Sequence, residues 1–137
     1  MKLKYVEHRD DVVIENCYKI MDYEHRKGPK TLFHGNMGSR IVLMHQWHSC
    51  NERMVRDGTS KTWYLSGWHS FRSFEEAKEY LKAFKNLEDK IIVRCHILGN
   101  IRPKAHSRAN VLLSQMILLD KVVWFYDKKW NYLLEKL

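Results

Sequence analysis

Proline, glycine and cysteine are all scarce in this chain of 137 residues, and each scarcity excludes a class of protein. With 2 Pro and 6 Gly, the composition differs from that of collagen-like, linker-dominated or disordered chains. The 3 cysteines, Cys17, Cys50 and Cys95, are an odd number at wide spacing, which does not suit the disulfide framework of a small secreted domain. We therefore expect free thiols in a reducing compartment.

Long hydrophobic runs are also missing. The first ten residues alternate charged and apolar side chains and contain no apolar run of signal-peptide length, and no later run is long enough to span a bilayer. We therefore expect a cytoplasmic protein without membrane contact. The hydrophobic fraction of 45% is sufficient for one core, which predicts a single domain over residues 1–137.

Acidic residues are absent from two long segments. The 24 Lys and Arg residues outnumber the 16 Asp and Glu residues, which gives a formal net charge of +8. No acid lies between Glu24 and Glu52, or between Asp89 and Asp120. If these two segments meet in the fold, their cations form one positive face, which would attract nucleic acid, an acidic protein or a phosphorylated ligand. The alternative is a charge that serves solubility alone.

Alternating apolar residues and turn signals predict a mostly antiparallel sheet. The expected strands are residues 17–23, 30–34, 40–47, 61–71, 90–98 and 110–119. Arg26-Lys27-Gly28-Pro29 predicts a hairpin turn between the first two. We expect residues 61–71 to be central and to neighbour residues 90–98, because a short helical connection joins them. Periodicity does not distinguish strand from helix over residues 110–125, where we favour a strand at the start.

One helix has a well-marked beginning. Ser73-Phe74-Glu75-Glu76 is a capping box, in which the Ser73 hydroxyl accepts from the Glu76 amide and the Glu76 carboxylate returns to the Ser73 amide. Apolar residues then recur at helical spacing as far as Phe84. A second, short helix is expected near residues 127–136. The predicted fold is α+β: a single domain with a twisted, mostly antiparallel sheet packed against one central helix and a short C-terminal helix.

His45, His48 and Cys50 have the residue types of a metal site. In a strand, however, His45 and His48 point to opposite faces, and no Cys-x-x-Cys pair completes a ligand set. We expect no metal. No glycine-rich phosphate loop, nucleophile elbow or Cys-His signature is present either, so no cofactor is expected.

Catalysis by clustered carboxylates is disfavoured, because half of the acids lie in the N-terminal stretch or on the central helix and the turn after it. One of two alternative enzymes is a metal-free ribonuclease, in which one histidine acts as base and another as acid; the other is suggested by a resemblance to a known fold. His34, His69 and His96 are the candidate catalytic residues of the ribonuclease, with His106 as a fourth. The favoured prediction has no catalytic residue.

The best single candidate for binding is the proline-containing loop 102–108, which alternates cations and is hard to bury. Arg and Lys would neutralise phosphates while an exposed ring stacks on an unpaired base. The equally simple alternative is a solvated loop. The predicted binding residues share a place in the two acid-free segments: Arg94, Arg102, Lys104 and Arg108, followed by Arg40 and His48.

Residues 65–80, Leu-Ser-Gly-Trp-His-Ser-Phe-Arg-Ser-Phe-Glu-Glu-Ala-Lys-Glu-Tyr, followed by the strand 91–98, resemble a block of small accessory proteins of bacteriophages and mobile elements. In those proteins an aromatic-glycine strand enters a helix that contains Ala and Tyr. The resemblance covers the central third of the chain and is mainly structural. It implies a phage or prophage setting, in which small proteins often inhibit host defence nucleases such as CRISPR effectors, and it transfers no catalytic residue.

The order of strands and helix also resembles the ADP-ribosyltransferase fold, with His34 of Phe33-His34-Gly35 at the place of that family's early histidine. The family needs a glutamate near a late strand, where this chain has Asn110. We therefore expect a non-enzymatic protein that binds nucleic acid or a nucleoprotein complex through a cationic face. An acidic protein surface is a further expected partner, and no feature specifies an oligomer.

Overall fold

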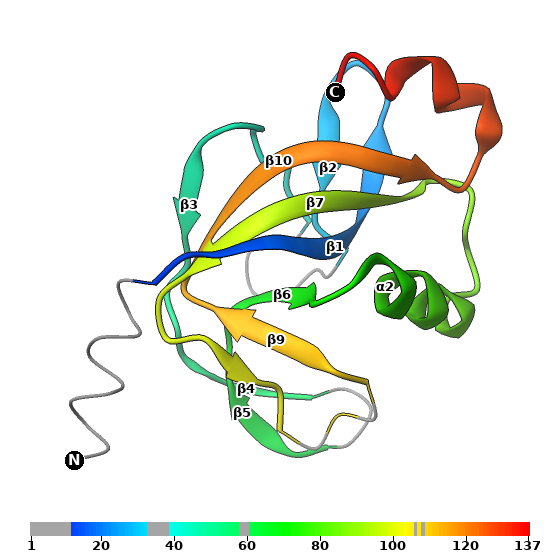
Figure 1. The fold of residues 1–137 in the computed structure, drawn as a ribbon. Helices are drawn as coiled ribbons and strands as arrows, with labels where there is room; N and C mark the ends of the chain where they lie inside the picture. Colours follow the sequence, from blue (N-terminus) through cyan, green and yellow to red (C-terminus); the bar gives the residue numbers. More distant parts are fainter. Residues whose placement is uncertain (1–11, 33–38, 58–60, 106, 108) are drawn as a thin grey trace.

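The computed structural model describes residues 12–32, 39–57, 61–105, 107 and 109–137 (Figure 1). The strands are β1 (Ile14–Glu24), β2 (Gly28–Lys30), β3 (Trp47–Ser49), β4 (Met54–Arg56), β5 (Trp63–Leu65), β6 (Trp68–Phe71), β7 (Lys90–Leu98), β8 (Arg102–Pro103), β9 (Val111–Ser114) and β10 (Met116–Phe125). The helical elements are α2 (Phe74–Tyr80) and two 3-10 helices, η1 (Leu81–Ala83) and η2 (Lys128–Leu133). The predicted α+β fold with a mostly antiparallel sheet is confirmed.

A long β1 organises the main sheet. Within the described residues the strand order is β3-β10-β7-β1-β6-β9-β8, with β2 paired to the end of β1. All these pairings are antiparallel. At Tyr18, β1 pairs with Phe71 of β6 on one side and with Arg94 of β7 on the other. The eleven residues of β1 are thus long enough to connect the two halves of the sheet.

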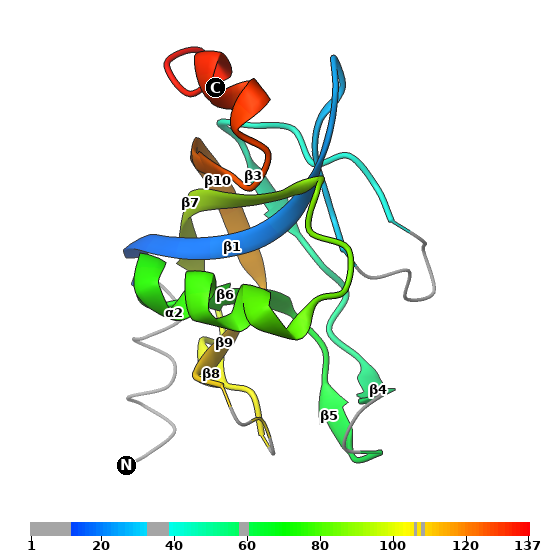
Figure 2. The same cartoon turned by 90° about the vertical axis from the view of Figure 1, so that its right-hand side faces the viewer.

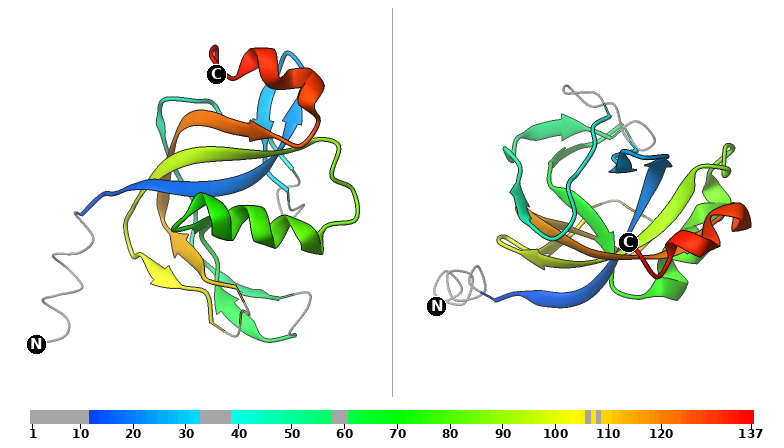
Figure 3. Two further views of the ribbon diagram at one scale, coloured as in Figure 1. Left: turned by 45° about the vertical axis from the view of Figure 1, so that its right-hand side comes forward. Right: turned by 90° about the horizontal axis from the view of Figure 1, so that it is seen from above.

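A bent strand brings the two halves together again. β9 and β10 are separated only by Gln115, whose amide donates to the Gly99 carbonyl at 2.9 Å. β9 pairs with β6, whereas β10 pairs with β7. Because β6 and β7 lie on opposite sides of β1, this bend makes the sheet curl back on itself, and the view from above shows strands winding around a common centre (Figure 3).

The curled sheet has a core on each face. The inner core gathers β1, β7 and β10 around Trp68, Cys95 and Ile117, which are all buried. The outer core lies under α2, whose Ala77 packs with Ile20 and Phe71 of the sheet. Figure 2 shows α2 lying along the outside of β1 and β6. Alternate residues of a strand point to opposite faces, so the main strands contribute apolar side chains to both cores.

The predicted helix start is confirmed. The Ser73 hydroxyl accepts from the Glu76 amide at 3.1 Å, as predicted. The Glu76 carboxylate accepts from the Ser73 hydroxyl at 3.1 Å, in place of the predicted bond to the Ser73 amide. The other Glu76 oxygen accepts from the Asn110 side chain at 3.1 Å. The cap therefore fastens α2 to the start of β9.

The prediction of one continuous strand over residues 61–71 is wrong. β5 pairs only with β4 in a separate two-stranded sheet, while β6 belongs to the main sheet. The chain breaks at Ser66–Gly67, where Gly67 passes close to the backbone of Ser114. The expectation that residues 61–71 and 90–98 are neighbours is also wrong, because β1 lies between β6 and β7.

Two smaller predictions need correction. Residues 40–46 form no strand beyond an isolated bridge at Ile41, and β3 starts only at Trp47, since His45 has a φ of 64° that interrupts the extended chain. Gly28 and Pro29 lie within β2, and the turn occupies the three residues before them. The predicted short C-terminal helix is present as the 3-10 helix η2, capped by Asp127.

Replacing Gly67 by Ala should destabilise the protein. A Cβ atom there would lie 2.9 Å from the Ser114 carbonyl oxygen, which is a backbone atom and cannot move aside as a side chain can. We expect a loss of about 1–3 kcal/mol in the free energy of unfolding, typical of forced overpacking, measured by urea denaturation. An unchanged unfolding midpoint would show that this close approach is not a constraint.

Candidate functional site

Arg102, the first predicted binding residue of the loop 102–108, is held by the protein itself. Its Nη1 donates to Glu52 Oε2 at 2.6 Å and to the Asn100 carbonyl at 2.7 Å. Its Nη2 donates to the carbonyls of Leu65 and Ser66 at 2.8 and 2.9 Å. The guanidinium thus joins β8 to the ends of the β4–β5 hairpin, and it serves structure rather than an external ligand.

Lys104 and Arg94 are paired as well. Lys104 Nζ lies 2.8 Å from Asp57 Oδ2 and 4.7 Å from the centre of the Tyr64 ring. Arg94 donates from Nε and Nη2 to Asp120 Oδ2 at 2.9 and 2.6 Å. These two cations are therefore neutralised by acids from outside their own segment.

The two acid-free segments do meet, because β3 pairs with β10 over Trp47–Ser49. Their cations nevertheless do not form the expected continuous free face. Lys90, for example, is buried and donates to Asp22 at 2.7 Å. The sequence showed where acids were absent locally, but acids from other parts of the chain supply the partners.

The remaining predicted binding residues have different outcomes. Arg108 lies outside the described residues, as do His34 and His106. Arg40 and His48 come together at one place, since the Arg40 guanidinium lies 5.2 Å and the His48 ring 6.4 Å from the centre of the Trp68 ring system.

His45, His48 and Cys50 do not converge on a common point. His45 is exposed, His48 Nε2 donates to the Leu43 carbonyl at 2.8 Å, and the Cys50 thiol is directed at the Ser114 carbonyl at 3.9 Å. Throughout the described ranges, no group of three or more His, Cys, Asp or Glu side chains is placed to hold a metal ion.

His69 and His96 do not form an acid–base pair. They lie on β6 and β7, which are separated by β1, and the register places His69 level with Ile92, four residues along β7 from His96. Two strand spacings separate their backbones by about 9–10 Å, and the offset along the strands adds to this distance. Burial, reinforced by Lys19 and Lys104, lowers the pKa of His69 to about 3, which leaves it a weak base near neutral pH. Its Nδ1 donates to the Gly67 carbonyl at 3.1 Å. His96 Nδ1 accepts from the Asn16 amide at 3.3 Å.

The β4–β5 hairpin, which we call the arm, is the feature that sequence reasoning missed. It lies apart from the main sheet, at the end of the molecule opposite the C-terminus (Figures 1 and 2). Tyr64 faces the body, where it contacts Lys104 and His69. Because side chains alternate along a strand, the cross-strand pairs Arg56–Trp63 and Met54–Leu65 lie on the opposite, outer face.

The arm combines exposed cations with an exposed aromatic ring. Trp63 is 63% exposed and Met54 is 56% exposed. Arg56 lies on the outer face with Trp63, and its Nε donates to the Lys61 carbonyl at 3.3 Å. Arg53 and Lys61 flank the two strands, and none of the three exposed cations forms an ion pair with a described acid. The two acids next to the arm, Glu52 and Asp57, form ion pairs with Arg102 and Lys104.

A turn signal in the sequence predicts this hairpin. Two short strand-like segments, Met-Val-Arg at 54–56 and Trp-Tyr-Leu at 63–65, flank a polar stretch that begins with Asp57-Gly58, a dipeptide typical of β-hairpin turns. The continuous alternation of residues 61–71 concealed this signal, because it placed Trp63 on the same face as residues of the sheet.

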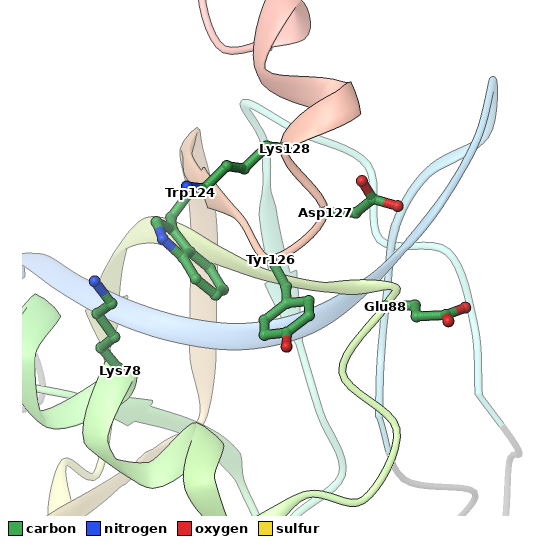
Figure 4. Close-up of a pocket in the computed structure, with 6 residues that line it drawn as sticks. All are labelled: Lys78, Glu88, Trp124, Tyr126, Asp127 and Lys128. Carbon is green, nitrogen blue, oxygen red and sulfur yellow. The ribbon is translucent and has the colours of Figure 1, made fainter.

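A second aromatic surface carries mixed charge. A shallow pocket of about 480 Å³ lies between α2 and β10 (Figure 4) and is lined by Lys78, Glu88, Trp124, Tyr126, Asp127 and Lys128. Lys78 Nζ lies 5.8 Å from the centre of the Trp124 ring system. The two acids weaken its attraction for a polyanion, so the arm is the better candidate.

No protein-family model, curated protein or solved structure matches this chain. Among the helices of the described residues, none has the length and apolar character needed to cross a bilayer. Function is therefore inferred from the geometry and charge of the arm.

Replacing Arg102 by Gln should destabilise the protein, in contrast to the small effect expected of a solvated loop residue. The change removes an ion pair whose side chains are only 21% and 15% exposed and leaves Glu52 without its charged partner. We expect a loss of about 2–3 kcal/mol, measured by urea unfolding. Arg53→Gln, an exposed cation at the base of the same arm, is the control and should change stability by less than about 0.5 kcal/mol. Equal stability of both variants would contradict the structural role of Arg102.

The lowered pKa of His69 predicts a distinct acid sensitivity. Because the folded state holds this imidazole neutral down to a pH of about 3, while the unfolded chain binds a proton near pH 6.5, stability is lost as the pH falls between these values. In the unmodified protein this effect makes the free energy of unfolding fall by up to about 1.4 kcal/mol per pH unit, and His69→Gln should remove this contribution. Urea unfolding of both proteins from pH 7 to pH 4 measures it, and parallel profiles would refute the prediction.

Proposed function

We propose that this protein is a non-enzymatic binding protein that attaches to single-stranded nucleic acid through the outer face of its β4–β5 arm. The observation that carries the proposal is the cross-strand pair of Arg56 and the exposed Trp63. A base can stack on the indole while the neighbouring guanidinium approaches its phosphate.

Charge and rigidity support this assignment. Arg53, Arg56 and Lys61 provide three cations that no described acid neutralises, on a protein of formal net charge +8. Such a surface attracts a polyanion at long range. Arg102 and Lys104 hold the arm against the body, so little ordering of the arm opposes binding.

Stacking on Trp63 favours single strands over duplexes, since paired bases present no free ring face. The resemblance of residues 65–80 to accessory proteins of phages and mobile elements supports a role in shielding nucleic acid from a host nuclease. Docking of the same arm on a nucleoprotein complex is the competing outcome of the experiment below.

Replacing Trp63 by Ala should weaken binding of a labelled oligothymidylate or oligouridylate of about 12 nucleotides by about tenfold or more, because one stacked base contributes about 1–3 kcal/mol. Fluorescence anisotropy at low salt measures the affinity, and comparison of the two strands separates DNA from RNA preference. Tyr132→Ala is the control, since Tyr132 is 60% exposed and lies on η2 at the other end of the molecule (Figure 1). Failure of the unmodified protein to bind either strand, or equal effects of both variants, would overturn the proposal.

The triple variant Arg53→Gln, Arg56→Gln and Lys61→Gln should lower the slope of log affinity against log salt by about 2, at about 0.7 for each lost phosphate contact. A triple variant with the same loss of charge on β10 and in the C-terminal segment serves as control: Lys121→Gln, Lys128→Gln and Lys136→Gln, all exposed. If both triple variants change the slope equally, net charge rather than the arm governs binding. If neither strand binds but a nucleoprotein complex does, docking on that complex replaces the proposal.

A further inference from the structure

Lys19 is a charged side chain placed in the inner core. It lies on β1 between Cys17 and Met21, which share its face and are fully buried. Lys19 itself is only 8% exposed. Its Nζ donates to the His69 carbonyl at 2.8 Å and lies 5.7 Å from the centre of the Trp68 ring system.

No carboxylate of the described chain balances this ammonium. The groups that act on it are Arg40, His69 and the thiols of Cys95 and Cys50. Burial raises the pKa of both thiols and lowers that of His69 to about 3, so these three are uncharged near neutral pH. Burial also lowers the pKa of Lys19 to about 8, with Arg40 adding to the effect. At pH 7 the charges of Lys19 and Arg40 therefore repel each other, and no described anion compensates them.

Two further donors beside Lys19 have no partner. The Trp68 Nε1 and the Ser70 hydroxyl are buried and form no hydrogen bond with any described group. Both belong to β6 and share a face by alternation. Since Tyr18 pairs with Phe71 across antiparallel strands, Lys19 and Ser70 are the next facing positions. An unsatisfied buried polar group is unfavourable by about 1–3 kcal/mol, and two on one face call for a common acceptor.

Arg40 lies on the solvent-exposed side of this cluster. Its side chain is exposed, and the guanidinium lies 5.2 Å from the centre of the same Trp68 ring system. Arg40 donates its backbone amide to Thr31 Oγ1 at 3.0 Å, whereas its guanidinium forms no ion pair with a described acid. The indole is thus flanked by one buried cation and one exposed cation.

We propose that Lys19, Arg40, Trp68 and Ser70 form a binding site for a small oxyanion, separate from the nucleic-acid interface of the arm. The oxyanion has several lone pairs and can accept from the ammonium, the guanidinium, the indole N–H and the hydroxyl together. Its negative charge compensates two cations that otherwise repel each other. The site is independent of the proposed nucleic-acid binding, because none of its four residues lies on the arm.

Sulfate is the probe, because its charge does not change between pH 7 and pH 9.5. Thermal unfolding is followed as sodium sulfate replaces sodium chloride at constant ionic strength. A specific site gives a saturable rise in Tm, whereas general salting-out gives a rise without saturation. We expect the saturable rise in the unmodified protein and its loss in Lys19→Met, which keeps the length and apolar body of the side chain.

Arg40→Gln tests the site without altering the core, and Lys121→Gln, an exposed cation of β10, controls for net charge. Arg40→Gln should weaken sulfate binding about tenfold or more, and Lys121→Gln should leave it unchanged. Trp68→Phe, which keeps an aromatic ring but removes the N–H, should weaken binding several-fold, in line with one lost hydrogen bond. If the saturable rise is absent, or survives both Lys19→Met and Arg40→Gln, the proposal is wrong.

The pH profile distinguishes this site from a general cationic surface. Of the facing groups, arginine stays charged, burial holds His69 neutral, and burial raises the pKa of both thiols above the usual value. Lys19, with a pKa of about 8, is therefore the first of them to lose its proton between pH 7 and pH 9. Sulfate affinity should therefore fall about tenfold over this range, and a constant affinity would refute the role of Lys19. Displacement of sulfate by a 5′-phosphorylated but not by an unphosphorylated dinucleotide would assign the oxyanion to a terminal phosphate. Displacement by inorganic phosphate alone would assign it to a free ion.

Discussion

The guanidinium of Arg102 is the point on which the functional surface of this protein depends. It joins Glu52 on one side of the arm to the carbonyls of Leu65 and Ser66 on the other, and it is itself anchored to Asn100. The planar arrangement of its donors suits several acceptors at once. Without this contact, the short β4–β5 hairpin would have few interactions to hold it beside the main sheet, since isolated two-stranded hairpins are marginal in water.

The same ion pairs also determine which charges remain free. Glu52 and Asp57 flank the arm in sequence, yet they are paired with Arg102 and Lys104 from a distant segment. As a result, the cations of residues 102–104 are held in ion pairs within the protein, whereas Arg53, Arg56 and Lys61 remain exposed to solvent. A residue becomes available for binding because a neighbouring acid is already satisfied.

The inner core presents the opposite situation, in which a cation is buried without an acid. A buried ammonium is unfavourable unless it is neutralised or paired. Among the described residues the charged neighbour is another cation, Arg40, and the nearby Trp68 Nε1 and Ser70 hydroxyl can also donate. Apart from the His69 carbonyl, which accepts from Lys19, these groups are donors, and such a cluster is complementary to an anion. The arm and the core site thus share a preference for negative charge, but one offers an exposed flat surface and the other a partly enclosed cluster.

The features that depend on residues close together along the chain could be predicted from the sequence alone. The capping box at Ser73, the strand character of residues 17–23 and 90–98, and the α+β class rest on local hydrogen bonds and on periodicity, which are properties of a short stretch of chain. The separation of β5 from β6, the insertion of β1 between β6 and β7, and the pairing of Arg102 with Glu52 were decided only by the tertiary structure. Each of them joins residues that are far apart along the chain, and no local pattern records which distant backbone will fill a space or which distant acid will neutralise a cation.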